Sequence, residues 1–569
     1  MGVFAEGVNR MFMRHTSRLV AALILGIVVA GVLVAVFAPS ITPGYDTSFT
    51  LAWGRDLAHG LSLDFTHPSS PTPHPLALLA GLGAGFAPVH WAINAAGGLG
   101  VAAGLTTLAL LGFVTFEVTA SRIAAAAAVA CTAVSAPMGL LVLGASSDVA
   151  YAAIGLGAVL LTLRGRHAVA VAVFMVAALL RPEAVLFAVV PLALAFMAHR
   201  RPERHGVNHQ SPDRPGPTAR SNWTRTARVF TAGLIVSIAA WLATGAAGGD
   251  PLIALHSAST NAQVNNDPRG PLVALTHALP GLAGPTGWLT VVAAATALVV
   301  TVLAGRSRTR RTVTPKGRPG RSAPNKAAAR NAAARNAAAR SASVRKASVS
   351  KASVSKTSAR QAEATAPVGD TQQNATIVTG IFVGVGLIAY LAQGLTGTPL
   401  VARYLLLPAL LCVVLAARCI PLVARLVRNP RASKAAAAFV AVVLVVASVG
   451  ANVSGWHDVT SARQVRADAF TAASQLLHTD LARRCVAPVV VRSPAMVAMV
   501  ALTLDRPLRD ITVADQAGKG VLLQPLNNDA AQLAGYGPMT PLAQQAIFPT
   551  DAPPRQSNTD WALYSSCQP

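Results

Sequence analysis

The chain has 569 residues, of which 53% are apolar and only 12% are charged, and its mean hydropathy is +0.49. This composition excludes an ordinary soluble domain, because apolar runs near the ~20 residues that cross a bilayer recur along the chain. The net charge of +25 does not indicate nucleic-acid binding, since 16 Lys and Arg but no Asp or Glu lie between Arg306 and Arg360. We predict a polytopic α-helical membrane protein with no nucleic-acid partner.

About eleven spans are predicted from the apolar runs and oriented by Lys and Arg, which concentrate in cytoplasmic loops. The basic amino end, residues 1–18, stays in the cytoplasm, and the carboxyl tail lies outside the plasma membrane. Residues 76–88 are short with Pro near both ends, which predicts a helix along the outer face. The stretch 168–198 is predicted as two short helices broken at Arg181-Pro182-Glu183. The predicted spans are residues 19–38, 91–114, 123–143, 149–163, the two halves of 168–198, 229–246, 287–304, 377–396, 399–417 and 434–451.

The same pattern divides the rest of the chain. A transmembrane core, residues 19–304, contains an outer loop at 39–90, and residues 376–451 hold the last spans. Between them, residues 305–375 are basic and repetitive, which predicts an unstructured cytoplasmic linker attracted to anionic membrane lipids. Residues 452–569 alternate short apolar runs with turn residues, which predicts a small mixed α/β extracytoplasmic domain.

Cys485 and Cys567 both lie in this tail, on the side of the membrane where disulfides persist. We predict that Cys485 and Cys567 form a disulfide. No cysteine or histidine spacing in the chain is typical of a zinc site.

The outer loop opens with Tyr45-Asp46-Thr47 directly after the first apolar run. Ionisable groups held at a membrane face usually mark a site, because keeping them near hydrocarbon without partners is costly. Asp46 has two interpretations: a solvated carboxylate that caps the following helix, or a general base whose surroundings tune its acidity.

Asp56 and Arg55 follow on the same segment, where adjacent helical residues point to different sides. We therefore expect that both cannot face one ligand, and the alternative is a helical face carrying Asp56 with Arg55 in solvent. The histidines of this loop are too widely spaced for a helical metal pair, so a structural or substrate-contact role is predicted for His74.

Further charged groups stand where other predicted spans meet the outer face. Arg181 either forms a self-paired turn with Glu183 or holds a lipid phosphate, whose oxygens the planar guanidinium matches. Arg403-Tyr404 either anchors a span at the interface or serves as a second phosphate contact. Asp148 is either a helix cap or a second carboxylate. The spans as oriented bring Asp46, Asp148, Arg181 and Arg403 to one face.

Several short motifs resemble the GT-C superfamily of polytopic glycosyltransferases, in actinobacterial members that use polyprenyl-phosphate sugars. These motifs are Tyr45-Asp46-Thr47 with Phe49, Trp53 to Ala58, Pro71 to Leu76, Arg181-Pro182-Glu183, Gly249 to Leu252 and Ala402 to Pro408. Members often carry paired acidic residues in the first outer loop, whereas this chain has Asp46-Thr47-Ser48. The resemblance therefore implies no paired-acid metal site, although a divalent metal stays compatible with the sequence.

The resemblance implies an inverting hexosyl or pentosyl transferase in which Asp46 is the catalytic base. Its partners would be a polyprenyl-phosphate sugar, with no cofactor, and a cell-envelope glycan or glycolipid acceptor. The residues predicted to bind substrate are Asp56, His74, Asp148, Arg181, Glu183, Arg403 and Tyr404. Two other classes stay open: a lipid or solute transporter, and a non-catalytic scaffold of the cell envelope.

Overall fold

The computed structural model resolves the fold in two compact units, described separately: residues 1–25 with 299–377, and residues 26–298 with 378–569. The second unit holds all the contacts discussed below. The structure describes residues 25–33, 35–36, 43–65, 70–200, 219–256, 270–282, 287–312, 368–395, 400–427, 429–479, 489–491, 494–513, 521–527, 530 and 554–565. Most of the predicted linker, residues 313–367 of 305–375, lies outside these residues, as do Cys485 and Cys567.

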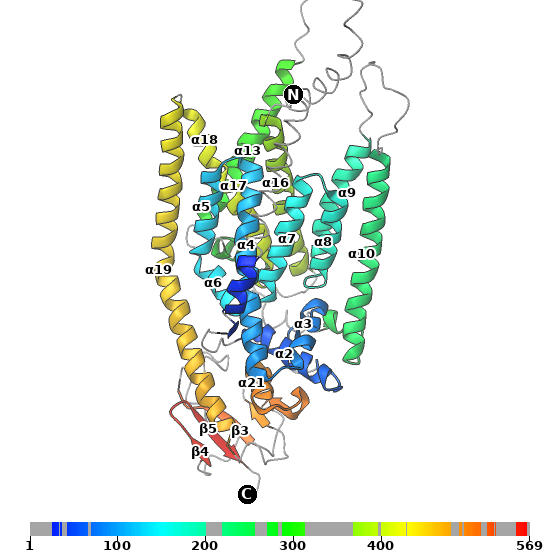
Figure 1. Cartoon of the computed structure of the whole chain (residues 1–569), viewed down its shortest axis with the longest axis vertical. Helices are drawn as coiled ribbons and strands as arrows, with labels where there is room; N and C mark the ends of the chain where they lie inside the picture. Colours follow the sequence, from blue (N-terminus) through cyan, green and yellow to red (C-terminus); the bar gives the residue numbers. More distant parts are fainter. Residues whose placement is uncertain are drawn as a thin grey trace, which may run out of the picture. The chain divides into compact units, whose positions relative to one another are not determined.

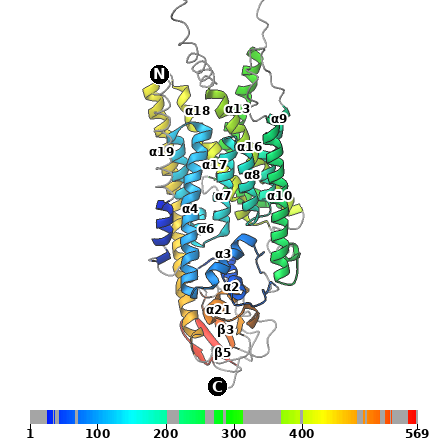
Figure 2. The same ribbon diagram turned by 45° about the vertical axis from the view of Figure 1, so that its right-hand side comes forward.

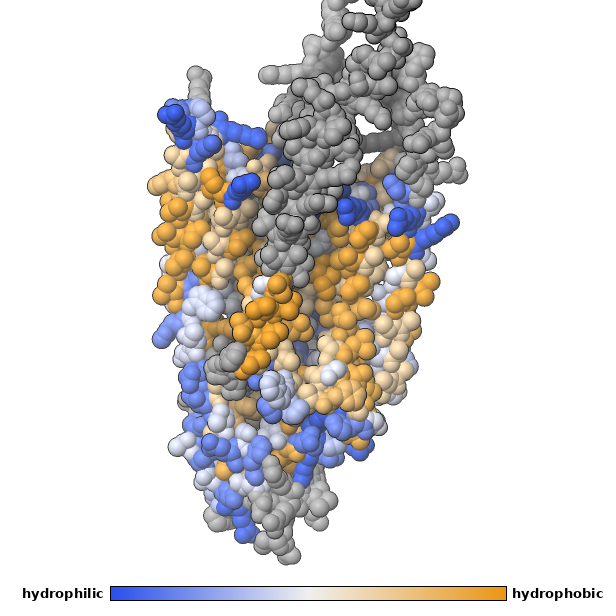
Figure 3. Space-filling view, viewed as in Figure 1, coloured by the Kyte–Doolittle hydropathy of each residue, from blue (hydrophilic) through white to orange (hydrophobic). Residues whose placement is uncertain are grey.

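Most of the described chain is helical, and six segments are long and apolar enough to cross a membrane. They are α4 (Val89–Thr119), α10 (Ala219–Ala247), α13 (Gly287–Thr312), α16 (Val368–Leu395), the run Ala402–Leu426 and α19 (Pro430–Leu477). A bent pair, α5 (Arg122–Ala133) and α6 (Ala136–Leu143), makes up to seven. These findings confirm a polytopic helical membrane protein, while the total of about eleven spans stays a prediction. Figures 1 and 2 show these helices, and Figure 3 shows apolar side chains over the middle of the bundle with polar ones toward both ends.

Three shorter helices fill the bundle: α7 (Ser147–Leu163), α8 (His167–Ala178) and α9 (Ala184–Arg200). The predicted break at Arg181-Pro182-Glu183 lies in the turn between α8 and α9. Proline disfavours helical backbone at the residue before it and cannot donate a backbone hydrogen bond, so the helix ends there. The turn between α8 and α9 lies at the end of the bundle where α2 and α3 lie (Figure 1), and its Leu179 carbonyl accepts from the Leu76 amide at 3.1 Å.

Two helices at this end come from the predicted outer loop: α2 (Tyr45–Ala58) and α3 (Pro75–Gly85). With 11 residues, α3 is about 17 Å long, well short of the ~30 Å hydrocarbon core. The two helices touch through glycine: a Cβ on Gly54 would lie 2.0 Å from the carbonyl carbon of Gly81. Only residues without a side chain allow the two backbones to approach this closely.

The tail differs from prediction at its start, because α19 runs without a break for 48 residues, past the expected end of the span at 451. Beyond it lies the predicted mixed α/β domain, in which α21 (Pro494–Leu504) accompanies a five-stranded sheet in the order β2-β1-β3-β5-β4. Strand β1 pairs parallel with β2 and β3, and β5 pairs antiparallel with β3 and β4. The strands are β1 (Val489–Val491), β2 (Ile511–Val513), β3 (Val521–Pro525), β4 (Gln556–Ser557) and β5 (Trp561–Ser565).

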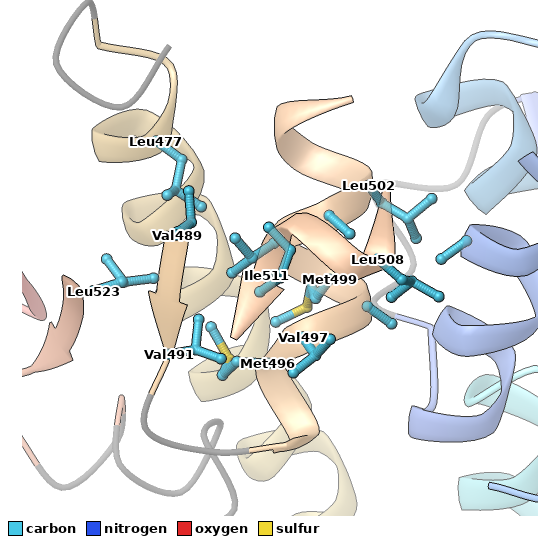
Figure 4. Packing of buried hydrophobic residues seen from close by; sticks show 14 of the residues in the cluster. Leu477, Val489, Val491, Met496, Val497, Met499, Leu502, Leu508, Ile511 and Leu523 are labelled. Atoms are coloured by element: carbon cyan, nitrogen blue, oxygen red, sulfur yellow. The ribbon is translucent and has the colours of Figure 1, made fainter. Parts of the chain in front are cut away.

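One apolar core joins this tail domain (the sheet, α21 and the last turns of α19) to α2 and α3. Figure 4 shows its tail side, where Val489 of β1 lies beside Leu477 of α19 and Ile511 of β2 lies beside Met499 of α21. The same cluster continues into α2 through Trp53, which is 1% exposed. The tail domain and α2 therefore pack as one body.

Candidate functional site

The position of Asp46 is set by how the start of α2 docks on the loop between α6 and α7. The Gly44 amide donates to the Gly144 carbonyl at 2.9 Å, and the Thr47 hydroxyl donates to the Ala145 carbonyl at 2.9 Å. A Cβ at Gly44 would lie 2.9 Å from the Gly144 oxygen, so this close approach favours glycine. Asp46 therefore stands in the first turn of α2, next to the start of α7.

Arg403 links Asp46 to a second carboxylate. It lies on the short helix η1 (Ala402–Leu405) that precedes α17 (Leu406–Ala417), and its Nη2 is 2.7 Å from Asp46 Oδ2. Its Nε is 3.4 Å from Asp148 Oδ2. The Arg403 side chain is 30% exposed, whereas that of Asp148 is 1% exposed. One partly accessible cation is thus shared by two carboxylates.

Arg181 lies deeper and pairs with the other oxygen of Asp148, and its side chain is only 4% exposed. Its guanidinium carbon lies 4.2 Å from the centre of the Tyr404 ring, a cation–π contact. The Ser146 hydroxyl caps α7 and donates to Asp148 Oδ2 at 2.9 Å. Asp46, Arg403, Asp148 and Arg181 form a chain of alternating charge, called the charge cluster below.

Two more predicted residues border the cluster with polar atoms left unused. The buried atoms Glu183 Oε1, Arg181 Nε and His74 Nδ1 have no hydrogen-bond partner among the described residues. Arg181 forms its ion pair with Asp148 from α7 rather than with Glu183, although the charges of Arg181 and Glu183 still interact. Buried polar atoms without partners are rare in folded proteins, and a bound water, ion or ligand is one explanation for them.

His74 directly precedes α3 and meets the Trp241 ring edge to face, with ring centres 5.7 Å apart. Burial lowers the pKa of His74 well below its usual value, and the nearby charges of Arg181 and Arg403 lower that pKa further. His74 is therefore a neutral imidazole at physiological pH, able to form hydrogen bonds without adding charge.

Two cavities adjoin the cluster on different sides. The Arg181 cavity, about 350 Å³, has Arg181, His74, Glu183 and Tyr404 in its wall and is otherwise mainly apolar. The Asp46 cavity, about 560 Å³, is lined by Asp46 and by residues of α3, α4 and the start of α7. The cluster thus lies between two compartments, each large enough for part of a small molecule.

Asp56 does not join this cluster. Its Oδ1 is 2.9 Å from Arg55 Nη2, and its Oδ2 accepts from the Leu508 amide at 3.2 Å. Arg55 is 6% exposed and donates to the Ala501 carbonyl at 2.8 Å, so the alternative interpretation, with Arg55 in solvent, is wrong. The side chains of Arg55 and Asp56 both contact residues 501–508 of the tail domain, although these adjacent residues were expected to face different sides. Substrate binding by Asp56 stays an untested prediction, and its contacts here are with the tail domain.

Sequence reasoning missed several neighbours of the site. Trp241 of α10 contacts His74 and donates its indole N–H to the Ala178 carbonyl at 2.9 Å. Ser147 and Thr47 line the Asp46 cavity. The one sequence signal for them was position, since Thr47 and Ser147 directly adjoin the predicted carboxylates and Trp241 lies within the predicted span 229–246.

No protein-family model matches the chain, and no curated protein matches it. Among solved structures, the chain is similar to ArnT from Cupriavidus metallidurans bound to undecaprenyl phosphate, with a TM-score of 0.44 and 11% sequence identity. The match covers 92% of this chain and 95% of that one. What this chain does is therefore inferred from the residues of its own site.

Proposed function

We propose that the protein is a membrane glycosyltransferase that moves a sugar from a polyprenyl-phosphate donor to a cell-envelope acceptor. The observation that carries the proposal is the charge cluster, which lies between two largely apolar cavities and leaves Arg181, Glu183 and His74 with unused polar atoms. Two partly apolar substrates could each enter through one of the two cavities and meet at the charge cluster.

The Arg181 cavity suits the donor. Arg181 and the nearby Arg403 supply two cations for a phosphate, and guanidinium groups bind phosphate oxygens through paired hydrogen bonds. The wall on α10 includes Ile238 and Leu242, which are 51% and 42% exposed and give the cavity an apolar edge. A polyprenyl chain would lie along this edge, while the sugar reaches the polar atoms of His74 and Glu183.

The Asp46 side of the cluster suits the acceptor. An acceptor hydroxyl attacks the anomeric carbon of the sugar and transfers its proton to the Asp46 carboxylate. On the opposite face of that carbon the bond to the phosphate oxygen breaks, and its electron pair leaves with the polyprenyl phosphate. The sugar is therefore transferred with inversion.

Arg403 connects the two halves of this reaction. In the structure it pairs with Asp46 at 2.7 Å, and a donor phosphate would compete for the same guanidinium. Donor binding would free an Asp46 oxygen for the acceptor hydroxyl while Arg403 stabilises the departing phosphate charge. Most of the rate gain would come from this electrostatic stabilisation and from holding the two substrates in line.

The orientation remains part of the proposal: the site faces the outside of the plasma membrane and the amino end lies in the cytoplasm. The support is the distribution of Lys and Arg, which is dense before residue 19 and in the linker between Arg306 and Arg360. An extracytoplasmic site suits a lipid-carried sugar, because soluble nucleotide sugars are not supplied there.

The test is sugar transfer by purified protein in lipid, with a panel of radiolabelled polyprenyl-phosphate sugars. Asp46→Asn should lower kcat by about 10²- to 10⁴-fold, since it removes the base but keeps the shape. Asp510→Asn is the matched control, because Asp510 is 47% exposed in the tail domain, and it should transfer normally. Equal transfer by wild type and Asp46→Asn, or no transfer from any donor, would contradict the proposal.

A further inference from the structure

The cavity beside Asp46 has an uneven distribution of polar groups. Its polar lining is confined to two short stretches, at the start of α2 and at the start of α7. Its remaining wall, on α3 and α4 and beyond, is made of alanine, glycine, leucine and one isoleucine. The polar side chains of the lining are Asp46, Thr47, Thr50, Ser146 and Ser147.

Most of those polar groups are already engaged. The hydroxyls of Thr47 and Thr50 donate to the carbonyls of Ala145 and Asp46, each at 2.9 Å, and Ser146 donates to Asp148. The Ser147 hydroxyl oxygen is buried and has no hydrogen-bond partner among the described residues. Ser147 and the Asp46 carboxylate are thus the side-chain groups available to the polar part of a ligand.

The apolar part of the cavity extends to the surface of the bundle. Leu79 of α3 and Leu99 of α4 both line it, and both are 61% exposed. Trp91, at the start of α4, is 49% exposed, and tryptophan favours the membrane interface. Leu99 lies on a helix long enough to span the membrane, where exposed leucine faces lipid tails, so the cavity opens toward the bilayer.

We propose that the acceptor is a membrane lipid with a hydroxylated head and an apolar tail, rather than a soluble glycan. The inference rests on the proposed function and names the acceptor class for the same site. The head hydroxyl reaches Asp46 and Ser147, and the tail lies against the alanine and leucine wall. As in the proposed reaction, the new bond joins the head oxygen to the anomeric carbon, its proton goes to Asp46, and the phosphate leaves.

The chemistry of the wall is the reason. Every unit of a glycan carries several hydroxyls, and each one buried without a partner weakens binding by about tenfold or more. The α3 and α4 wall offers no side-chain partner for them. A hydrocarbon tail has no such requirement and gains from leaving water.

The first test gives wild-type protein and labelled donor either linear alkanols of four to eight carbons or soluble mannotriose. We expect labelled alkyl glycosides, with transfer efficiency rising by up to about fourfold per added methylene. Transfer to mannotriose without transfer to octanol would overturn the inference. Hydrolysis of the donor would also overturn it if octanol neither accepts the sugar in place of water nor slows the hydrolysis. Failure to consume any donor would instead sink the proposed function itself, so the two failures are distinguishable.

Because alkanols also concentrate in the bilayer as they lengthen, matched variants decide the cause of the trend. Ala95 of α4 is exposed and lines the cavity, so Ala95→Phe should lower octanol transfer by about tenfold or more, because the ring would occupy part of the cavity. Ala239 of α10 is exposed and lies outside the lining of both cavities, so Ala239→Phe should transfer like wild type. Equal octanol transfer by the two variants would overturn the inference.

Ser147 is tested separately as an acceptor-binding residue. Ser147→Ala should raise the octanol KM about fivefold and leave kcat close to that of wild type, because it removes one hydrogen bond. A drop in kcat with unchanged KM would overturn this assignment.

Discussion

Two pairs of opposite charge involve α2, one at its start and one later along the helix, and they differ in what surrounds them. At the start of α2, Asp46 borders a cavity, and the side chain of its partner Arg403 is 30% exposed. Later on α2, Arg55 and Asp56 are 7% and 2% exposed and are saturated by the backbone of the tail domain. Burial alone does not make a charged group a candidate for function. It becomes one when a cavity beside it can hold a ligand and nearby polar atoms lack hydrogen-bond partners.

The difference predicts opposite effects of mutation. In the charge cluster, a change should affect the reaction more than the fold, because a ligand is expected to provide part of its interactions. At the Arg55–Asp56 pair, a change should affect the fold first, because the partners are carbonyl, amide and carboxylate groups of the chain itself. The predictions that follow test this contrast.

The largest effect is expected at Arg55. Arg55→Met leaves Asp56 buried with an amide partner but no cation, which should lower the free energy of unfolding by about 3–5 kcal/mol. Arg509→Met is the control, because Arg509 is 56% exposed and lies 4.0 Å from Asp510, and it should cost about 0.5 kcal/mol or less. Chemical unfolding in detergent and limited proteolysis of the tail domain measure both. Equal losses of unfolding free energy in Arg55→Met and Arg509→Met would contradict a structural role for Arg55.

Arg403 should show the reverse pattern. Arg403→Gln removes a cation that is 30% exposed, so we expect kcat for sugar transfer to fall by about 10²- to 10³-fold. The free energy of unfolding should fall by only about 1 kcal/mol, because water reaches the site and Arg181 still pairs with Asp148. Loss of folding in step with activity would mean that Arg403, like Arg55, is mainly structural.

The sequence predicted much of this arrangement but could not separate the two pairs. The break at Arg181-Pro182-Glu183 was found because proline ends a helix locally, and the gathering of Asp46, Asp148 and Arg403 followed from orienting the spans by charge. Asp56 was grouped with them, since it is the same residue type in the same loop. Its amide partner, Leu508, lies 452 residues away in sequence, and no local pattern reports a contact of that kind.

The fold shows the same limit. Apolar runs located α4, α8 and α9 closely, because hydrophobicity and chain length are local properties. The 48-residue length of α19 was missed, since its later half is polar on the outside and is held by packing against the tail domain. Tertiary contacts, rather than hydropathy, extend that helix.

Glycines between α2 and α3 offer a test of how firmly α2 is held. Gly81→Ala would place a Cβ 2.4 Å from the Thr50 carbonyl oxygen, which should cost about 1–3 kcal/mol by forcing the helices apart. At Gly83, two residues along the same helix, an added Cβ would meet nothing within 4 Å. Gly83→Ala should therefore stabilise the protein by about 0.5–1 kcal/mol. Thermal unfolding of both variants checks the pair, and effects of the same sign would contradict the close contact.

The smallest effect concerns His74 and is seen only as a dependence on pH. Its pKa is lowered well below the usual value by burial and by Arg181 and Arg403, so the folded protein resists the proton that the unfolded histidine takes up below about pH 6.5. The free energy of unfolding should thus be insensitive to His74 above that pH and fall below it, by at most about 1.4 kcal/mol per pH unit. His74→Gln, which cannot titrate, should remove this component of the slope between pH 6.5 and 5. An unchanged slope would mean that His74 accepts its proton in the folded state, beside two arginines, and that the site is more open to water than its burial indicates.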